Sequence, residues 1–157
     1  ATILLGKKWG LVTLICDVFK AFIIVYLFKN IFFVEIAYSF IVGGLAVIIG
    51  HIFPFYLKFK GGKGFASYLG FILGVDFIAF LILIGIILLV VIVTDYIVIG
   101  TLSCTIFSPI YLFISFGLIP CILSVVVSLI IIFKHKKNFI DIKNKKERSV
   151  RQVLFKK

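Results

Sequence analysis

The residues best suited to chemistry lie in one segment, residues 50–67, which reads GHIFPFYLKFKGGKGFAS. Its centre is Gly61-Gly62-Lys63-Gly64. Glycines allow successive backbone N–H groups to turn toward one point, which makes a concave site for an anion. A helix that begins after Gly64 would add its positive N-terminus, and Lys63 would add a full positive charge. The segment therefore indicates a phosphate-binding site.

A plainer explanation of the same residues stays open. A lysine-bearing loop between two apolar segments is expected from membrane topology alone, and the spacing is not that of a Walker A loop, GxxxxGK[ST]. A helix N-terminus stabilises an anion by only about 0.3–1 kcal/mol at an exposed site. A tight phosphate site would need donors from elsewhere in the chain.

Three polar residues accompany this segment within apolar stretches. His51 could donate a hydrogen bond to a phosphate or move a proton, or it could simply bond a neighbouring helix end. Asp17 and Lys20 are three residues apart in one apolar stretch. Each costs about +2.5 to +3.5 kcal/mol at the centre of a membrane helix, so we expect an ion pair with a supporting role.

The second half of the chain offers fewer candidates. His135, Asn138 and Glu147 lie in a basic tail, and the hydroxyl of Thr101, like that of Ser103, is expected to bond a backbone carbonyl. We find no Ser/His/Asp set and no metal-ligand spacing, so an enzyme of this kind would act by positioning and charge stabilisation. Three cysteines, Cys16, Cys104 and Cys121, are interpreted as small buried hydrophobic residues.

The composition identifies the surroundings of these residues. The chain of 157 residues is 63% hydrophobic, with a mean hydropathy of +1.30. Soluble domains contain about 45–50% apolar residues, so the sequence predicts a polytopic membrane protein. Its net charge of +11 is attributed to the positive-inside rule rather than to binding of nucleic acid.

Charged residues divide the chain into apolar stretches. The sequence predicts an all-α membrane helix bundle with six visible transmembrane segments, at residues 9–28, 36–57, 64–75, 77–94 and two within 96–133 that turn at 117–120. The stretch 64–75 is short for a span. Both visible ends would then be cytoplasmic.

The predicted organisation has two parts. Residues 1–133 would form the membrane domain, with a cytoplasmic loop at 58–64, and residues 134–157 would form a basic cytoplasmic tail. In that tail, the spacing of Val150, Val153 and Leu154 indicates a short interfacial helix.

Segment 50–67 resembles the central motif of the bacterial acyl-phosphate:glycerol-3-phosphate acyltransferases (the PlsY type), roughly GHxFPxFxxFKGGKGVAT. Residues 5–10, LGKKWG, followed by Asp17 and Lys20, are similar to that family's LGKKxG…D…K stretch. Residues 96–101 resemble the end of its RYVSLAS stretch, and residues 135–147 resemble its HxxNIxRLxxGxE. The resemblance covers most of the chain.

The resemblance implies a reaction. A fatty acyl group would pass from an acyl phosphate to the 1-hydroxyl of glycerol 3-phosphate, giving lysophosphatidic acid and phosphate in the first acylation of phospholipid synthesis. It implies no cofactor or metal, and a site that faces the cytoplasm from the bacterial inner membrane. Gly61, Gly62, Lys63 and Gly64 would hold phosphate.

Other positions acquire roles from the same resemblance. Thr101 and Asn138 would position substrates beside His51 and His135, while Asp17, Lys20 and Glu147 would support the architecture. The predicted partners are glycerol 3-phosphate, acyl phosphate and membrane lipid, without nucleic acid. The sequence gives no indication of the oligomeric state.

The sequence also departs from the family pattern. Ile3, Asp95 and Asp141 stand where the family usually has arginines, Val98 replaces a serine, and the expected glycine before Glu147 is missing. The family has seven spans, and its first motif, SGNxGxTN, would end just before Ala1. Since the chain also contains no methionine, we expect it to lack that N-terminal part. The alternatives to an active enzyme are an inactive relative and a small transporter of an anionic solute.

Overall fold

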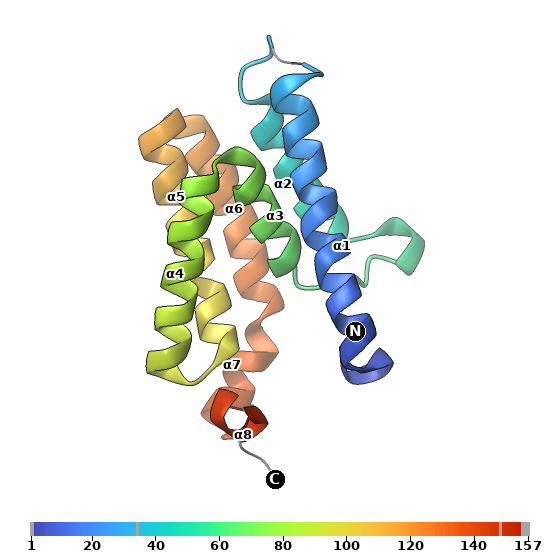
Figure 1. Ribbon diagram of the computed structural model, residues 1–157, viewed down its shortest axis with the longest axis vertical. Helices are drawn as coiled ribbons and strands as arrows, with labels where there is room; N and C mark the ends of the chain where they lie inside the picture. Colours follow the sequence, from blue (N-terminus) through green and yellow to red (C-terminus); the bar gives the residue numbers. More distant parts are fainter. Residues whose placement is uncertain (1, 34, 148, 155–157) are drawn as a thin grey trace. The chain divides into compact units, whose positions relative to one another are not determined.

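A computed structural model of the chain describes residues 2–33, 35–147 and 149–154, with side chains between residues 8 and 152 (Figure 1). Every regular element within those ranges is a helix. They are α1 Thr2–Asn30, α2 Ser39–Ile52, the 3-10 turn η1 Phe55–Leu57, α3 Phe65–Val75, α4 Phe77–Thr94, α5 Ile97–Phe116, α6 Leu118–Lys134, α7 Lys136–Lys143 and α8 Val150–Leu154.

The predicted apolar stretches all form helices. α3 ends at Val75, and Asp76 begins α4 by accepting a hydrogen bond from the N–H of Ala79 at 2.6 Å. α5 and α6 separate at Gly117, which has φ 89°, so a glycine occupies a left-handed backbone position at the predicted turn. The tail forms α8 where a short helix was predicted. The side chains of Val153 and Leu154 lie outside the described residues.

Six full-length spans are not present, because one helix is short. Four segments are long and apolar enough to cross a membrane: Lys8–Asn30, Ser39–Leu57, Phe77–Thr94 and Ile97–Phe116. A fifth is added if α6 and α7, bent by 47°, count as one. α3 has 11 residues, roughly 16 Å of helix, which is about half the hydrocarbon thickness. The predicted all-helical membrane bundle is therefore confirmed, with a short third segment, and four or five of its segments are long enough to cross a membrane.

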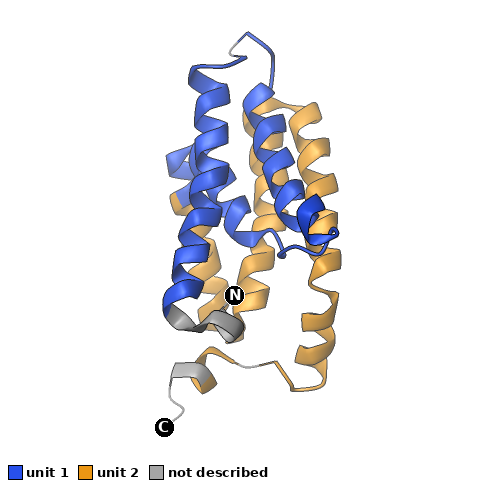
Figure 2. Ribbon diagram, turned by 90° about the vertical axis from the view of Figure 1, so that its right-hand side faces the viewer, with its two compact units in different colours: residues 1–80 blue, residues 81–157 orange. Residues whose placement is uncertain are grey.

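The chain divides into two compact units, residues 1–80 and 81–157, coloured separately in Figure 2. In the first unit, α1 packs on α2 and α3 around buried apolar side chains, namely Val25, Ile41, Ile48, Phe71 and Ile72. In the second unit, α5 packs on α6, and the buried hydroxyls of Ser108 and Ser124 are 3.0 Å apart. The predicted division between 1–133 and 134–157 stays a prediction.

Helices α1 and α3 approach each other at a glycine. A Cβ added to Gly70 would overlap the backbone carbonyl of Val18, and it would lie 3.0 Å from that residue's Cα. A small residue is needed where helix backbones come this close.

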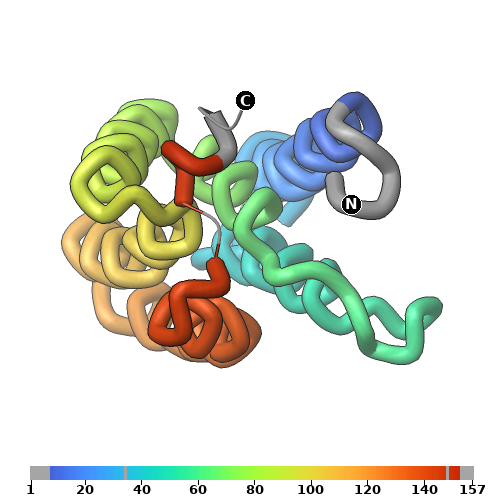
Figure 3. Tube along the Cα trace, turned by 90° about the horizontal axis from the view of Figure 1, so that it is seen from below, coloured from blue at the N-terminus to red at the C-terminus, as the bar shows by residue number. Residues whose placement is uncertain are grey.

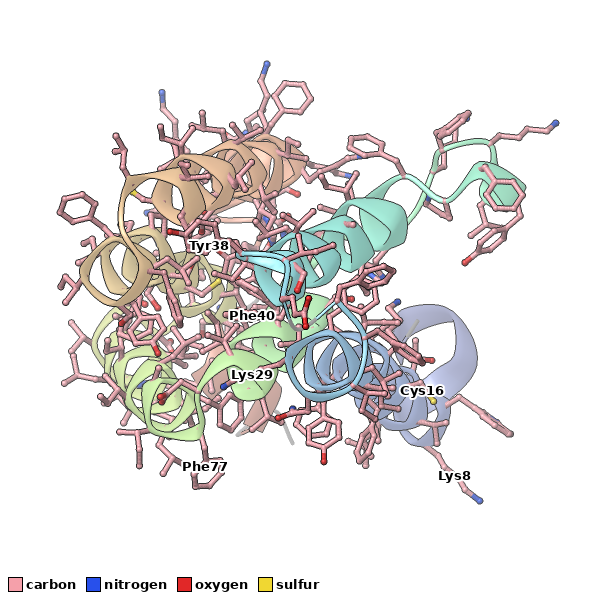
Figure 4. All side chains as sticks on the ribbon, turned by 90° about the horizontal axis from the view of Figure 1, so that it is seen from above. Lys8, Cys16, Lys29, Tyr38, Phe40 and Phe77 are labelled. Carbon is pink, nitrogen blue, oxygen red and sulfur yellow. The ribbon has the colours of Figure 1, made fainter. Side chains whose placement is uncertain are left out.

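At the far end of α1, the Lys29 ammonium donates to the carbonyl of Val75 at 2.7 Å and lies 5.9 Å from the centre of the Phe40 ring (Figure 4).

The outer faces of the helices are apolar. The large hydrophobic side chains left exposed include Ile92, Val93 and Ile114, as expected where a helix faces lipid acyl chains.

The cysteines are free but not uniformly buried, since Cys104 is buried, Cys121 is half-buried and Cys16 is exposed (Figure 4). The prediction of burial is wrong for Cys16, because α1 packs on its neighbours along one face only.

Gly70→Ala should destabilise the first unit, because the added methyl group meets backbone atoms that cannot rotate away. The expected loss is about 1–3 kcal/mol, as for other overpacked sites, read as a lower midpoint of thermal unfolding in detergent. Gly85→Ala is the matched control, since a Cβ there meets no atom within 4 Å. An unchanged midpoint for Gly70→Ala would contradict the close contact of α1 with α3.

Candidate active site

The loop that follows α2 carries the candidate phosphate-binding residues. It extends away from the helices of the first unit (Figures 1 and 3) and exposes Phe55 by 79% and Tyr56 by 73%. Lys58 and Phe59 both have positive φ, 52° and 60°, and the chain turns back there toward the end of α2. Aromatic and basic side chains together suit a membrane–water interface.

The glycines of this loop close the end of α2. Gly61 N–H donates to the carbonyl of Ile52 at 3.2 Å, and Gly62 N–H donates to the carbonyl of His51 at 3.2 Å. These carbonyls belong to the last turn of a helix, where no intrahelical donor is available. Both N–H groups are therefore engaged with the helix end in this structure, and phosphate binding by Gly61 and Gly62 stays a prediction. The backbone of this loop satisfies the helix end first.

The start of α3 supplies N–H donors instead. Gly64 is its N-cap, with φ 91°, and the first N–H groups of a helix have no partner within it. Ser67, in this first turn, has a hydroxyl that is buried and without a hydrogen-bond partner among the described residues. Lys63 is exposed immediately before the cap. Ser67 is not among the predicted site residues, although it is the last residue of segment 50–67.

Two glycines of the loop are required by close packing. A Cβ on Gly61 would overlap the carbonyl oxygen of His51, and one on Gly62 would overlap Nε2 of the same residue. Any larger residue at either position would push the loop off the end of α2. The loop and His51 are therefore one packed structure.

Asp17, Lys20 and His51 form a polar cluster between α1 and α2. Lys20 Nζ lies 2.5 Å from Asp17 Oδ1 and 2.8 Å from His51 Nδ1, and His51 Nδ1 lies 3.3 Å from Asp17 Oδ1. The predicted ion pair is confirmed. His51 bonds the charged pair on α1, which neither sequence-based alternative foresaw.

The second unit contains a separate group of candidate residues. The amide nitrogen of Asn138 donates to both carboxylate oxygens of Glu147, each at 3.1 Å. His135 is only 4% exposed, and its Nδ1 donates to the carbonyl of Ile131 at 2.8 Å. Thr101 donates to the carbonyl of Val98 at 2.8 Å, which confirms the prediction for that hydroxyl. The functional roles of these residues remain predictions.

Comparison with known proteins identifies the family. A family model described as glycerol-3-phosphate acyltransferase matches residues 1–145. The chain belongs to the glycerol-3-phosphate acyltransferase family. This confirms the resemblance seen in the sequence, and it places the chain among membrane acyltransferases of phospholipid biosynthesis.

Individual acyltransferases are similar over nearly the whole chain. Glycerol-3-phosphate acyltransferase 1 of Oceanobacillus iheyensis is 37% identical over 99% of this chain and 78% of its own length. The enzyme of Staphylococcus carnosus is 34% identical over 88% of this chain and 71% of its own length.

Solved structures of PlsY, an integral membrane glycerol 3-phosphate acyltransferase, have the same fold. Its glycerol 3-phosphate form gives a TM-score of 0.84 at 26% identity, over 97% of this chain and 76% of that one. Its lysophosphatidic acid form gives 0.81 at 27% identity, over 94% and 76% of the two chains.

Two of the positions that depart from the acyltransferase pattern, Asp95 and Asp141, form hydrogen bonds in the second unit. The carbonyl of Asp95 accepts from Val150 N–H at 2.9 Å, and its Oδ1 accepts from Arg151 N–H at 3.0 Å, so Asp95 fastens α8. The carbonyl of Asp141 accepts from Glu147 N–H at 3.1 Å, which fixes the turn that brings Glu147 to Asn138. The side chain of Ile3 lies outside the described residues.

Acid should weaken the attachment of α8, because the contact with the Asp95 carboxylate titrates while the Val150 bond to its carbonyl does not. A hydrogen bond from the Ser149 side chain, followed by the Arg151 N–H and charge, lowers the pKa of Asp95 below its ordinary value of 3.8. Because the folded-state pKa is depressed, this contribution is complete above 3.8 and is lost as the pH falls through the lower folded-state value. The amide resonances of residues 149–152 should broaden or shift in that acid range and stay constant at neutral pH.

The same contact can be removed by substitution. Asp95→Ala should speed amide hydrogen exchange at residues 149–152 several-fold at neutral pH. Asp141→Ala removes an equal charge but keeps the backbone carbonyl that holds Glu147, so exchange at 149–152 should not change. Equal exchange in Asp95→Ala and the unmodified chain would show that the Asp95 carboxylate does not hold α8, since its backbone carbonyl remains in the variant.

Proposed function

We propose that this chain transfers a fatty acyl group from an acyl phosphate to the 1-hydroxyl of glycerol 3-phosphate. The products are lysophosphatidic acid and inorganic phosphate. Membership of the acyltransferase family supports the proposal, as does the likeness to PlsY in its glycerol 3-phosphate and lysophosphatidic acid forms. The observation that carries it is the loop that joins an exposed lysine to a helix N-terminus capped only by glycine, beside a buried hydroxyl that has no partner among the described residues.

The phosphate of a substrate would bind at the start of α3. Backbone N–H groups of the first turn point along the helix axis, and the helix dipole favours a negative charge there. Lys63 adds a charge and Ser67 adds a hydroxyl donor. Gly61 and Gly62, whose N–H groups donate to carbonyls of α2, remain part of the proposed site as the loop that positions Lys63. Gly64 keeps a role as the cap, because its φ of 91° suits glycine.

The chemistry needs positioning more than a strong base. The 1-hydroxyl oxygen bonds to the acyl carbon, the carbon–oxygen bond to phosphate breaks, and phosphate leaves with that electron pair. The hydroxyl proton ends on phosphate, which is a good leaving group. Thr101 and Asn138, the latter oriented by Glu147, are proposed to position the substrates. His135 supports the junction of α6 with α7.

The donor is already activated as a mixed anhydride, so the transfer requires neither a cofactor nor a metal ion. An acyl phosphate also carries a long apolar chain that partitions into the membrane, whereas glycerol 3-phosphate is soluble. We propose that the site faces the cytoplasm from the bacterial inner membrane. The support for this side is the charge of the loop at Lys58, Lys60 and Lys63 and of the basic tail.

The donor can be tested directly. The chain, expressed in its natural reading frame and purified in detergent, is supplied with labelled glycerol 3-phosphate and either palmitoyl phosphate or palmitoyl-CoA. Labelled lysophosphatidic acid should form with the phosphate donor and not with the thioester. A folded protein that makes no product from either donor would contradict the proposal and support an inactive relative.

Lys63→Ala should weaken the use of glycerol 3-phosphate without affecting membrane insertion. Loss of a hydrogen bond to a charged group costs about 1.5–3 kcal/mol, so kcat/KM should fall about 10- to 100-fold, mainly through KM. Lys60→Ala removes an equal charge from the same loop and should change kcat/KM less than about threefold, a surface-charge effect. Equal effects of the two substitutions would exclude a specific phosphate contact by Lys63.

A further inference from the structure

The contact between Lys20 and His51 determines where the histidine ring carries its proton. A lysine ammonium has three donors and no acceptor. Its Nζ lies 2.8 Å from His51 Nδ1, so this nitrogen must present a lone pair to form the hydrogen bond. An imidazolium has N–H groups on both nitrogens and could not accept. The contact therefore requires a neutral ring with its proton on Nε2.

Asp17 holds the Lys20 ammonium in place. Without Lys20, Asp17 would favour the opposite tautomer of His51. Its Oδ1 lies 2.5 Å from Lys20 Nζ and 3.3 Å from His51 Nδ1. A carboxylate only accepts hydrogen bonds. Without Lys20, Asp17 would draw a proton onto Nδ1, which gives the opposite tautomer or the charged ring. With Lys20 present, the shorter contact sets the proton on Nε2.

The protonated edge of the ring faces the candidate phosphate loop. A Cβ on Gly62 would meet Nε2 before any other atom, followed by Cε1 and Cδ2 of the same ring. Gly62 directly precedes Lys63, and Gly64 caps α3. The Nε2–H group therefore lies at the loop that carries the lysine and leads into the helix N-terminus.

We propose that Asp17 and Lys20 are positioning residues that hold His51 as the Nε2–H tautomer, so that it donates to a phosphoryl oxygen of the substrate at the 61–64 loop. His51 is the residue that touches substrate, and the charged pair acts through it. The identity of the phosphate rests on the proposed function. The tautomer does not depend on it and can be measured without substrate.

The chain contains an internal reference for that measurement. It has two histidines, and the second forms the opposite kind of contact. His135 Nδ1 lies 2.8 Å from the carbonyl of Ile131. A carbonyl only accepts, so His135 carries a proton on Nδ1. Long-range proton–nitrogen correlation spectra of the histidine-labelled chain in micelles should show one ring of each tautomer.

Lys20→Met should change the spectrum of one ring only. His51 should acquire a proton on Nδ1, opposite Asp17, while His135 keeps its pattern. Lys29→Met is the matched control, because Lys29 is on the same helix and also uses its ammonium as a donor, to the carbonyl of Val75 rather than to His51. It should leave both rings unchanged. A wild-type His51 protonated on Nδ1, or a Lys20→Met spectrum that matches wild type, would overturn the proposal.

A double substitution covers the risk that Lys20→Met leaves Asp17 unpaired in an apolar span and fails to fold. Asp17→Leu with Lys20→Met removes both charges together, and His51 should then show a mixture of tautomers. If the ring stays fully Nε2–H in this variant, the charged pair does not set the tautomer. Inorganic phosphate is the ligand probe, and its titration should shift Nε2 of His51 in the wild-type chain but not in Lys20→Met.

Kinetics separates this positioning role from simple support of the fold. Lys20→Met should raise KM for glycerol 3-phosphate about 10- to 100-fold, the range for a lost hydrogen bond to a charged group, and Lys20→Arg should restore most of it. Equal losses in Lys20→Met and Lys29→Met would indicate a structural effect alone and would contradict the proposal. An inactive wild type with the expected tautomers would instead remove the proposed function and leave the tautomer assignment intact.

Discussion

A charge inside an apolar segment must have a partner, and this requirement organises the first unit of the structure. Asp17 and Lys20 would each cost free energy of insertion if unpaired in a membrane helix. Here Lys20 Nζ lies 2.5 Å from Asp17 Oδ1. His51 completes the cluster at 2.8 Å from the ammonium. The ion pair thereby fixes the end of α2 against α1, and the glycine loop packs on that end.

The glycines of the loop close the end of α2 and allow close packing on His51. Gly61 and Gly62 look like an anion nest in sequence, but their N–H groups close the last turn of α2. Their lack of side chains is used for close approach to His51. The proposed anion site therefore centres on the start of α3, where Gly64 is the cap and the Ser67 hydroxyl is unpartnered among the described residues.

The departures from the acyltransferase pattern are also integrated into the fold. Asp95 stands where an arginine is usual, and it fastens α8 through its carbonyl and its carboxylate. Asp141 lies at the turn that presents Glu147 to the amide of Asn138. Only the Asp95 carboxylate contributes a side-chain contact here, because Asp141 acts through its backbone carbonyl.

The sequence alone determined the helices, because the period and length of apolar stretches and the breaks at Asp76 and Gly117 are local properties of the chain. It also determined the family, since the segment 50–67 is long and specific. The tertiary structure decided which polar groups form hydrogen bonds with one another. Which carbonyl receives the N–H of Gly62, and which nitrogen of His51 faces Lys20, depend on distances between segments far apart in sequence. Hydrogen bonding is sensitive to such distances within a few tenths of an ångström, and residue spacing cannot supply them.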